Sequence, residues 1–148
     1  MQQRIKQPDV YKIQPALLKS LVSLGDAAAS ELEHSLIHLV KLRASQINGC
    51  AFCQHMHANE ARKDGEQQHR LDVLPAWREV DIFSARERAA LAWTEALTRL
   101  ADQGVSDASF TQVAEHFSEK EIVNLSAAIA TINAWNRIAV GFNFVPNF

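Results

Sequence analysis

Two cysteines and one histidine are the residues of this chain whose types and spacing best suit chemistry. Cys50 and Cys53 are its only cysteines, and His57 follows four residues after the second one. If a helix begins near Cys50, a rotation of about 100° per residue brings all three side chains onto one face. Free backbone N–H groups at a helix start favour a thiolate, and a nearby histidine can accept the thiol proton. The pattern therefore predicts a redox-active dithiol with a histidine base.

The same residues allow two other interpretations. Two cysteines on a helix can simply fill a core, and with His57 and one further histidine they can form a zinc site. His34 and His38, four residues apart, are the candidates for that further ligand. Structural zinc sites mostly draw their ligands as two spaced pairs, whereas here three candidates lie on one helix. The sequence therefore favours redox chemistry, with no metal ion and no cofactor, over a dithiol or zinc-binding module.

The residue pattern leaves open which cysteine attacks a substrate. A position at the helix start favours Cys50, because unpaired N–H groups stabilise its thiolate. Adjacency to His57 favours Cys53, because side chains four residues apart on a helix are neighbours. Once either sulfur is oxidised to a sulfenic acid, the other can condense with it to form a disulfide. These are the minimum requirements of a dithiol peroxidase or a disulfide reductase.

Composition and charge bound the class of protein. Of 148 residues, 47% are hydrophobic and 22% charged, which is typical of one folded domain spanning residues 1–148. A net charge of −2 without a basic stripe argues against nucleic acid as a partner. The sequence has no signal-peptide pattern and no uninterrupted run of about 20 apolar residues, so we expect a cytoplasmic protein without membrane association. In the cytoplasm a CxxC pair is typically catalytic or metal-binding.

Hydrophobic periodicity predicts helices along most of the chain and no convincing strand, so the expected fold class is all-α. Residues 1–14 are expected to be irregular. The helices are expected over residues 15–24, 31–47 and 50–64, within 66–80, from 84 to about 103, from about 107 to 114, and over 119–140. The last of these is apolar around most of its circumference, which indicates burial on several sides and favours an oligomer.

Local signals mark several of these boundaries. Gly25 is expected to end the first helix, and the pair Asn48 and Gly49 to interrupt the chain before the cysteines. A serine followed three residues later by a glutamate is the capping box of a helix start. Such boxes are expected at Ser30–Glu33, Ser84–Glu87 and Ser118–Glu121.

The stretch from His38 to Cys53, followed by His57 and by residues 60–66, resembles the AhpD-like alkylhydroperoxidase group of the carboxymuconolactone decarboxylase family. The similarity continues through residues 77–79, 84–98 and 132–137. It implies an AhpD-like helical fold with the CxxC at the N-terminus of a central helix, assembled into trimers or hexamers. It also implies reduction of hydroperoxides and re-reduction by a thiol or dithiol donor. On this analogy Cys53 attacks the peroxide, Cys50 resolves the intermediate and His57 is the base.

His38 departs from the family pattern, which has a glutamate twelve residues before the first cysteine. A neutral His38 can hydrogen-bond to His57 but supplies no negative charge, so we expect a weaker proton relay near neutral pH. The two histidines can meet only if the chain bends at Gly49, because on one continuous helix they would lie about 100° apart. His38→Glu is predicted to raise peroxidase activity around pH 7. The intact CxxC argues against the lactone decarboxylation of other superfamily members.

Overall fold

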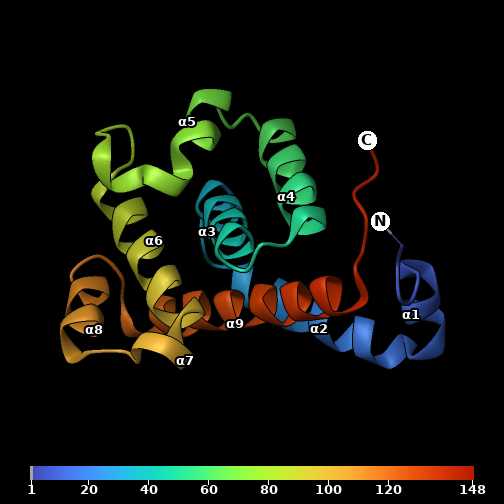
Figure 1. The fold of residues 1–148 in the computed structure, drawn as a ribbon. Helices are drawn as coiled ribbons and strands as arrows, with labels where there is room; N and C mark the ends of the chain where they lie inside the picture. Colours follow the sequence, from blue (N-terminus) through green and yellow to red (C-terminus); the bar gives the residue numbers. More distant parts are fainter. Residues whose placement is uncertain (1) are drawn as a thin grey trace.

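The computed structural model describes residues 2–148, which form helices and no strand (Figure 1). The all-α prediction is therefore confirmed. Ten helical elements follow one another in this range, all α-helical except the 3₁₀ helix η1. They are α1 (Gln7–Ile13), α2 (Pro15–Ala29), α3 (His34–Ile47), α4 (Ala51–Lys63), α5 (Gln68–Val73), η1 (Leu74–Glu79), α6 (Ala85–Thr98), α7 (Leu100–Gln103), α8 (Asp107–Ala114) and α9 (Glu119–Phe142).

Helix α3 lies at the centre, with α4 and α6 on either side of it and α9 passing across one end (Figure 1). It separates two apolar clusters. On one side Ile37 and Val40 belong to a cluster with side chains of α6 and α9, and on the other Leu39 and Leu42 belong to a cluster with residues of η1 and α6. Because neighbouring positions of α3 point into different clusters, the helix is buried on more than one face.

The N-terminal region differs from the sequence-based expectation. Residues 7–13 form α1 instead of an irregular segment, and α2 continues through Gly25 to Ala29. A Cβ atom at Gly25 would lie 3.5 Å from the Thr131 methyl group, an ordinary van der Waals distance, and α2 packs against α9 along this part of its length. Ser30 does not cap α3 either, because its hydroxyl donates to the Ala27 carbonyl at the end of α2.

Several other predicted boundaries agree with the structure, but the helix expected from 84 to about 103 is divided at Arg99 into α6 and α7. Capping boxes are present at Ser84 and Ser118, and Ser106 caps α8. The chain turns at Asn48 and Gly49, as expected, before α4 begins. Helix α9 ends two residues beyond the predicted range, where Asn143 adopts a left-handed conformation.

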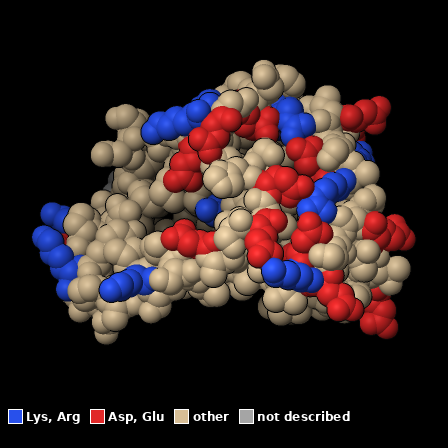
Figure 2. Space-filling view, turned by 180° about the vertical axis from the view of Figure 1, so that it is seen from behind, with Lys and Arg blue, Asp and Glu red and all other residues tan. Residues whose placement is uncertain are grey.

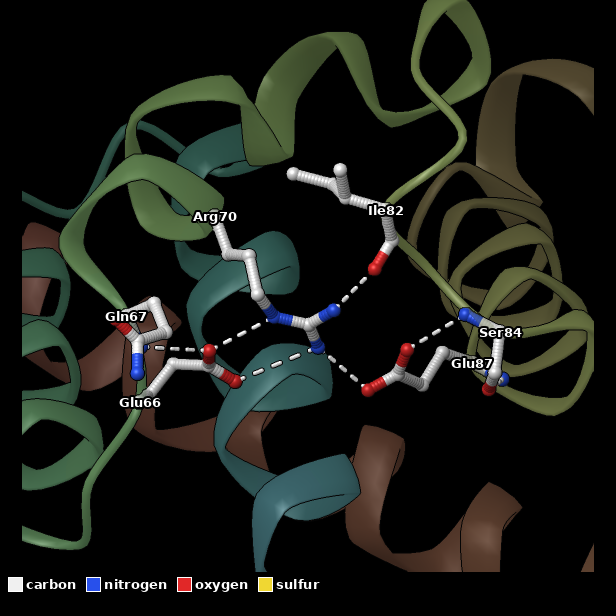
Figure 3. A network of polar contacts seen from close by, with 6 residues as sticks. All are labelled: Glu66, Gln67, Arg70, Ile82, Ser84 and Glu87. Atoms are coloured by element: carbon white, nitrogen blue, oxygen red, sulfur yellow. Dashed lines mark hydrogen bonds and ion pairs between the residues drawn. The ribbon is translucent and has the colours of Figure 1, made fainter.

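A polar network joins the segment after α4 to the start of α6 (Figure 3). The Arg70 guanidinium contacts the carboxylates of Glu66 at 2.8 Å and Glu87 at 2.6 Å, and it donates to the Ile82 carbonyl. Glu87 is also the carboxylate of the Ser84 capping box, so one side chain both caps α6 and binds Arg70. This arrangement fixes the loop that leads from η1 into α6.

Glu95 is a buried carboxylate at the centre of the fold. It accepts hydrogen bonds from Arg43 Nε at 2.9 Å and Trp77 Nε1 at 3.0 Å, and it also binds Arg78. Burial alone would raise its pKa, but the hydrogen bonds from these three side chains outweigh burial and hold the pKa below the ordinary value of 4.5. The ionised carboxylate therefore connects α3, η1 and α6.

Replacing this carboxylate should destabilise the fold at neutral pH. A depressed carboxyl pKa adds stability above the unfolded-state pKa, and that stability disappears as the pH falls through the folded-state value. We expect Glu95→Gln to lower the free energy of unfolding by about 3 kcal/mol at pH 7, because Arg43 loses its buried counter-charge. Urea unfolding at pH 7 and pH 3 measures this loss, which should shrink at the lower pH. Equal losses at both pH values would contradict the assignment.

Candidate functional site

The candidate site is organised by the turn between α3 and α4. Gly49 has a φ of +64°, a left-handed conformation that glycine adopts without strain. Cys50 is the N-cap of α4, and its sulfur accepts a hydrogen bond from the Cys53 N–H at 3.1 Å. Because the chain reverses here, α4 packs alongside α3. The turn thus places both cysteines at the start of α4, as the sequence predicted.

Three asparagines tie this turn to α9. The Asn48 amide donates to the side-chain oxygens of Asn133 and Asn136, both at 2.9 Å. Asn136 is almost completely buried and donates in turn to the Ser45 hydroxyl at 3.1 Å. The sequence patterns did not predict a structural role for the asparagines of α9. Their position on an otherwise apolar helix was the available signal that they bind another part of the chain.

Cys50 and Cys53 are joined by a disulfide, with Cα atoms 5.3 Å apart. Their exposed fractions are 1% and 2%. The pair belongs to a small cluster that includes Ala139 of α9 and Phe144 of the C-terminal segment, with Phe52 packed against it. The ring of Phe144 meets that of Phe52 edge-on at 5.6 Å. The C-terminal segment therefore covers part of the disulfide.

Cys53 and His57 line a common cavity of about 260 Å³ between α1, α2, α4 and α9. Its walls are mostly apolar, with Phe52 and Met56 from α4. Tyr11 of α1 and Trp135 of α9 also line it, their rings meeting edge-on at 6.2 Å. Cys50 does not line this cavity, although it belongs to the same apolar cluster as Cys53, Ala139 and Phe144. The two sulfurs thus differ in their surroundings.

His57 is buried, with 5% of its surface exposed, and its Nδ1 lies 2.8 Å from a carboxylate oxygen of Glu60. The hydrogen bond from His57 lowers the pKa of Glu60 below its usual value, more than burial raises it. Glu60 was not among the residues predicted from the sequence. Its spacing of three residues from His57 on one helix was the signal that could have identified it.

His38 pairs with a different carboxylate from the one that binds His57. Its Nε2 is 2.6 Å from a carboxylate oxygen of Asp64, at the C-terminal end of α4, and its Nδ1 is buried without a hydrogen-bond partner. Cys50, Cys53 and His57 are therefore grouped at the start of α4 by helical spacing, whereas His38 is paired with Asp64. The role of His38 as a fourth site residue stays a prediction, as does the expected gain from His38→Glu.

Within residues 2–148, no group of three or more His, Cys, Asp or Glu side chains has an arrangement that could hold a metal ion. None of the helices described in this range is both long and apolar enough to cross a bilayer. On the face shown in Figure 2, acidic and basic side chains are interspersed.

An all-helical fold with a CxxC pair at a helix start and a histidine one turn further on defines an AhpD-like protein. Residues 15–96 match the model of the Carboxymuconolactone decarboxylase family. The chain therefore belongs to this family, as its resemblance implied.

Two relatives match nearly the whole chain. The uncharacterized protein YdfG of Bacillus subtilis is 38% identical over 141 residues, which are 95% of this chain and 94% of YdfG. A crystal structure from Agrobacterium tumefaciens, of a protein of unknown function described as a candidate antioxidant defence protein AhpD, has a TM-score of 0.92 and 42% identity, covering 99% of both chains. The debrominase Bmp8 shares the fold, with a TM-score of 0.81 and 19% identity over 92% of this chain and 74% of its own.

The left-handed turn before the cysteines can be tested with a matched pair of substitutions. Gly49→Ala should lower the free energy of unfolding by about 1–2 kcal/mol, because a Cβ atom disfavours a left-handed backbone. Gly141→Ala, at an open position within α9, is the control and should be neutral or slightly stabilising. Urea unfolding of the two variants measures the difference. Equal effects would contradict a special role for Gly49.

Proposed function

We propose that the protein is a thiol-dependent peroxidase that reduces hydroperoxides through Cys50 and Cys53, with His57 as the base. The observation that carries the proposal is that Cys53 and His57 line one cavity while Cys50 is within bonding distance of Cys53. Membership of the Carboxymuconolactone decarboxylase family and likeness to a candidate antioxidant defence protein support it. The hydroperoxide substrate and the dithiol donor both come from solution.

The proposed reaction begins with the reduced dithiol. His57 takes the proton of Cys53, and the thiolate attacks the terminal oxygen of the hydroperoxide, so that the O–O bond breaks. The oxygen that leaves as alkoxide takes up a proton and departs as an alcohol, and Cys53 becomes a sulfenic acid. The Cys50 thiol then attacks this sulfur, a disulfide forms and water is released. Two electrons and two protons from a dithiol restore both thiols, and the donor is oxidised to its own disulfide.

The cavity supports Cys53 as the attacking sulfur, which is the assignment that the family resemblance implies. A substrate in the cavity would meet Cys53 first, because Cys53 lines the cavity and Cys50 does not. The apolar walls favour an organic hydroperoxide over hydrogen peroxide. A hydrocarbon group bound in the cavity would remove both its own apolar surface and that of the walls from water. Phe52, Met56 and Trp135 are the side chains that would contact such a group.

We also propose that the protein acts as a homo-oligomer, a trimer or hexamer, in the cytoplasm. Helix α2 supports assembly, because Leu17, Val22 and Leu24 each keep about 45% of their surface exposed. Only Ala28 of this apolar helix is buried within residues 2–148. A second copy packed on α2 would remove these side chains from water.

Cysteine variants test the peroxidase directly. Wild-type protein with a dithiol donor should consume an organic hydroperoxide continuously, whereas Cys53→Ser should lose this activity. Reduced Cys50→Ser, freed of the donor, should consume one equivalent of hydroperoxide and stop, because its sulfenic acid then has no thiol to condense with. A sulfenic-acid trapping reagent followed by mass analysis should label Cys53 in this variant. Activity of both variants equal to wild type would refute the redox mechanism, and stoichiometric zinc in the reduced protein would favour a metal-binding module.

A further inference from the structure

We propose that Glu60 is a positioning residue for His57, and that it supplies the carboxylate which the family pattern places at position 38. The inference rests on the proposed function in taking Cys53 as the attacking thiol. Glu60 would act through His57 and not touch the substrate. Its role is to keep a proton on Nδ1 of His57, so that Nε2 is the nitrogen that receives the proton of Cys53.

The geometry of the pair suits this role. Glu60 lies one helical turn after His57 on α4, and its Oε2 is 2.8 Å from Nδ1 of the imidazole. Cys53 lies one turn before His57 on the same helix, so the three side chains follow one another along one face. All three line the same cavity. The imidazole is thus bound at Nδ1 by Glu60, with Nε2 on the opposite edge of the ring.

The charge state of Glu60 determines which nitrogen carries the proton. Its hydrogen bond from His57 holds the pKa of this carboxyl below the usual range, so Glu60 is ionised at neutral pH. An ionised carboxylate only accepts hydrogen bonds, so Nδ1 must be the donor. A neutral His57 then carries its lone pair on Nε2. This is the tautomer that a base acting from Nε2 requires.

The charges around Glu60 come from several helices. Lys41 of α3 favours the ionised carboxylate, as does His38 when protonated. Asp26 of α2 lines the same cavity and adds negative charge, and Tyr11 of α1 is its other titratable group. The α9 side chains in the wall are uncharged. Glu60 is therefore the carboxylate in hydrogen-bond contact with His57, and the other charges act from further away.

The proton transfer leaves Glu60 unchanged chemically. The Cys53 thiol loses its proton to Nε2, and the resulting imidazolium keeps its Nδ1–H bonded to the carboxylate. The positive ring then lies between a thiolate and a carboxylate, and both negative groups stabilise it. His38 cannot substitute for Glu60 in this arrangement, because an imidazole supplies no negative charge and its Nε2 is already bound to Asp64.

Alkylation of the reduced Cys50→Ser variant tests the inference without any peroxide. Cys53 is then the only thiol, and its rate of reaction with iodoacetamide as a function of pH reports the formation of the thiolate. Adding Glu60→Gln should move the midpoint of this profile upward by about one pH unit, because the imidazolium loses its neighbouring charge. Glu60→Asp keeps the charge on a shorter side chain and should shift the midpoint less.

Asp64→Asn is the matched control. It removes the same charge from the other histidine–carboxylate pair, four residues further along the chain, and should leave the midpoint unchanged. In a His57→Asn background, Glu60→Gln should have no further effect, because the residue through which it acts is gone. An equal shift in Asp64→Asn, or a full shift without His57, would overturn the inference.

Peroxidase assays of the same substitutions separate this inference from the proposed function. With both cysteines present, Glu60→Gln should reduce the rate at pH 7 about tenfold, in keeping with an upward shift of about one unit in thiolate formation. If the wild type has no peroxidase activity but the alkylation midpoint still depends on Glu60, the proposed function fails and the positioning role stands. An unchanged midpoint in Glu60→Gln would refute the positioning role whatever the peroxidase result.

Discussion

The hydrogen bonds between Asn48 and the two asparagines of α9 hold the turn on which the whole site depends. A left-handed residue at Gly49 allows the reversal, but it does not fix the direction in which α4 leaves. That direction is fixed by contacts to α9, since Asn136 bonds both to Asn48 and to Ser45 at the end of α3. Buried amides of this kind cost free energy unless they are paired, so the pairing favours one geometry over its alternatives.

A second buried polar group in the core, the Glu95 carboxylate, also favours one geometry through its hydrogen bonds. Glu95 would be costly to bury alone, yet it accepts hydrogen bonds from α3 and η1 and so fixes the separation between these elements and α6. Apolar contacts on both sides of α3 supply the general driving force for packing, but they tolerate small shifts. Polar contacts with strict geometry are therefore placed where the position of α3, and through it α4, matters for the cysteines.

Local signals in the sequence were sufficient to predict most of the helices and their boundaries. The capping boxes at Ser84 and Ser118, the break at Gly49 and the helix that carries the cysteines depend on neighbouring residues and were predicted correctly. The failures at Gly25 and Ser30 have a tertiary cause. Gly25 would end an isolated helix, but here α2 packs against α9 and continues through Gly25 to Ala29, so that Ser30 follows its end. Contacts between distant segments override a local stop signal.

The site shows the same division between local and distant information. The grouping of Cys50, Cys53 and His57 follows from helical spacing alone, so the sequence revealed it. The sequence did not reveal the partner of His38. Asp64 is 26 residues away and meets His38 only because α4 folds back on α3. The Asn136 contact to the turn likewise joins residues 88 positions apart. Pairings of this kind depend on the packing of whole helices and not on any local pattern.

The two histidine–carboxylate pairs also differ in what their geometry depends on. A carboxylate at position 38 would have to reach His57 from another helix, so its alignment would vary with every shift between α3 and α4. Glu60 is on the same helix as His57, and the spacing of one turn sets their distance regardless of how α4 is docked. An imidazole held in this way keeps its orientation if the turn at Gly49 shifts, because both partners belong to α4. A histidine at position 38 therefore does not by itself leave His57 without a carboxylate partner.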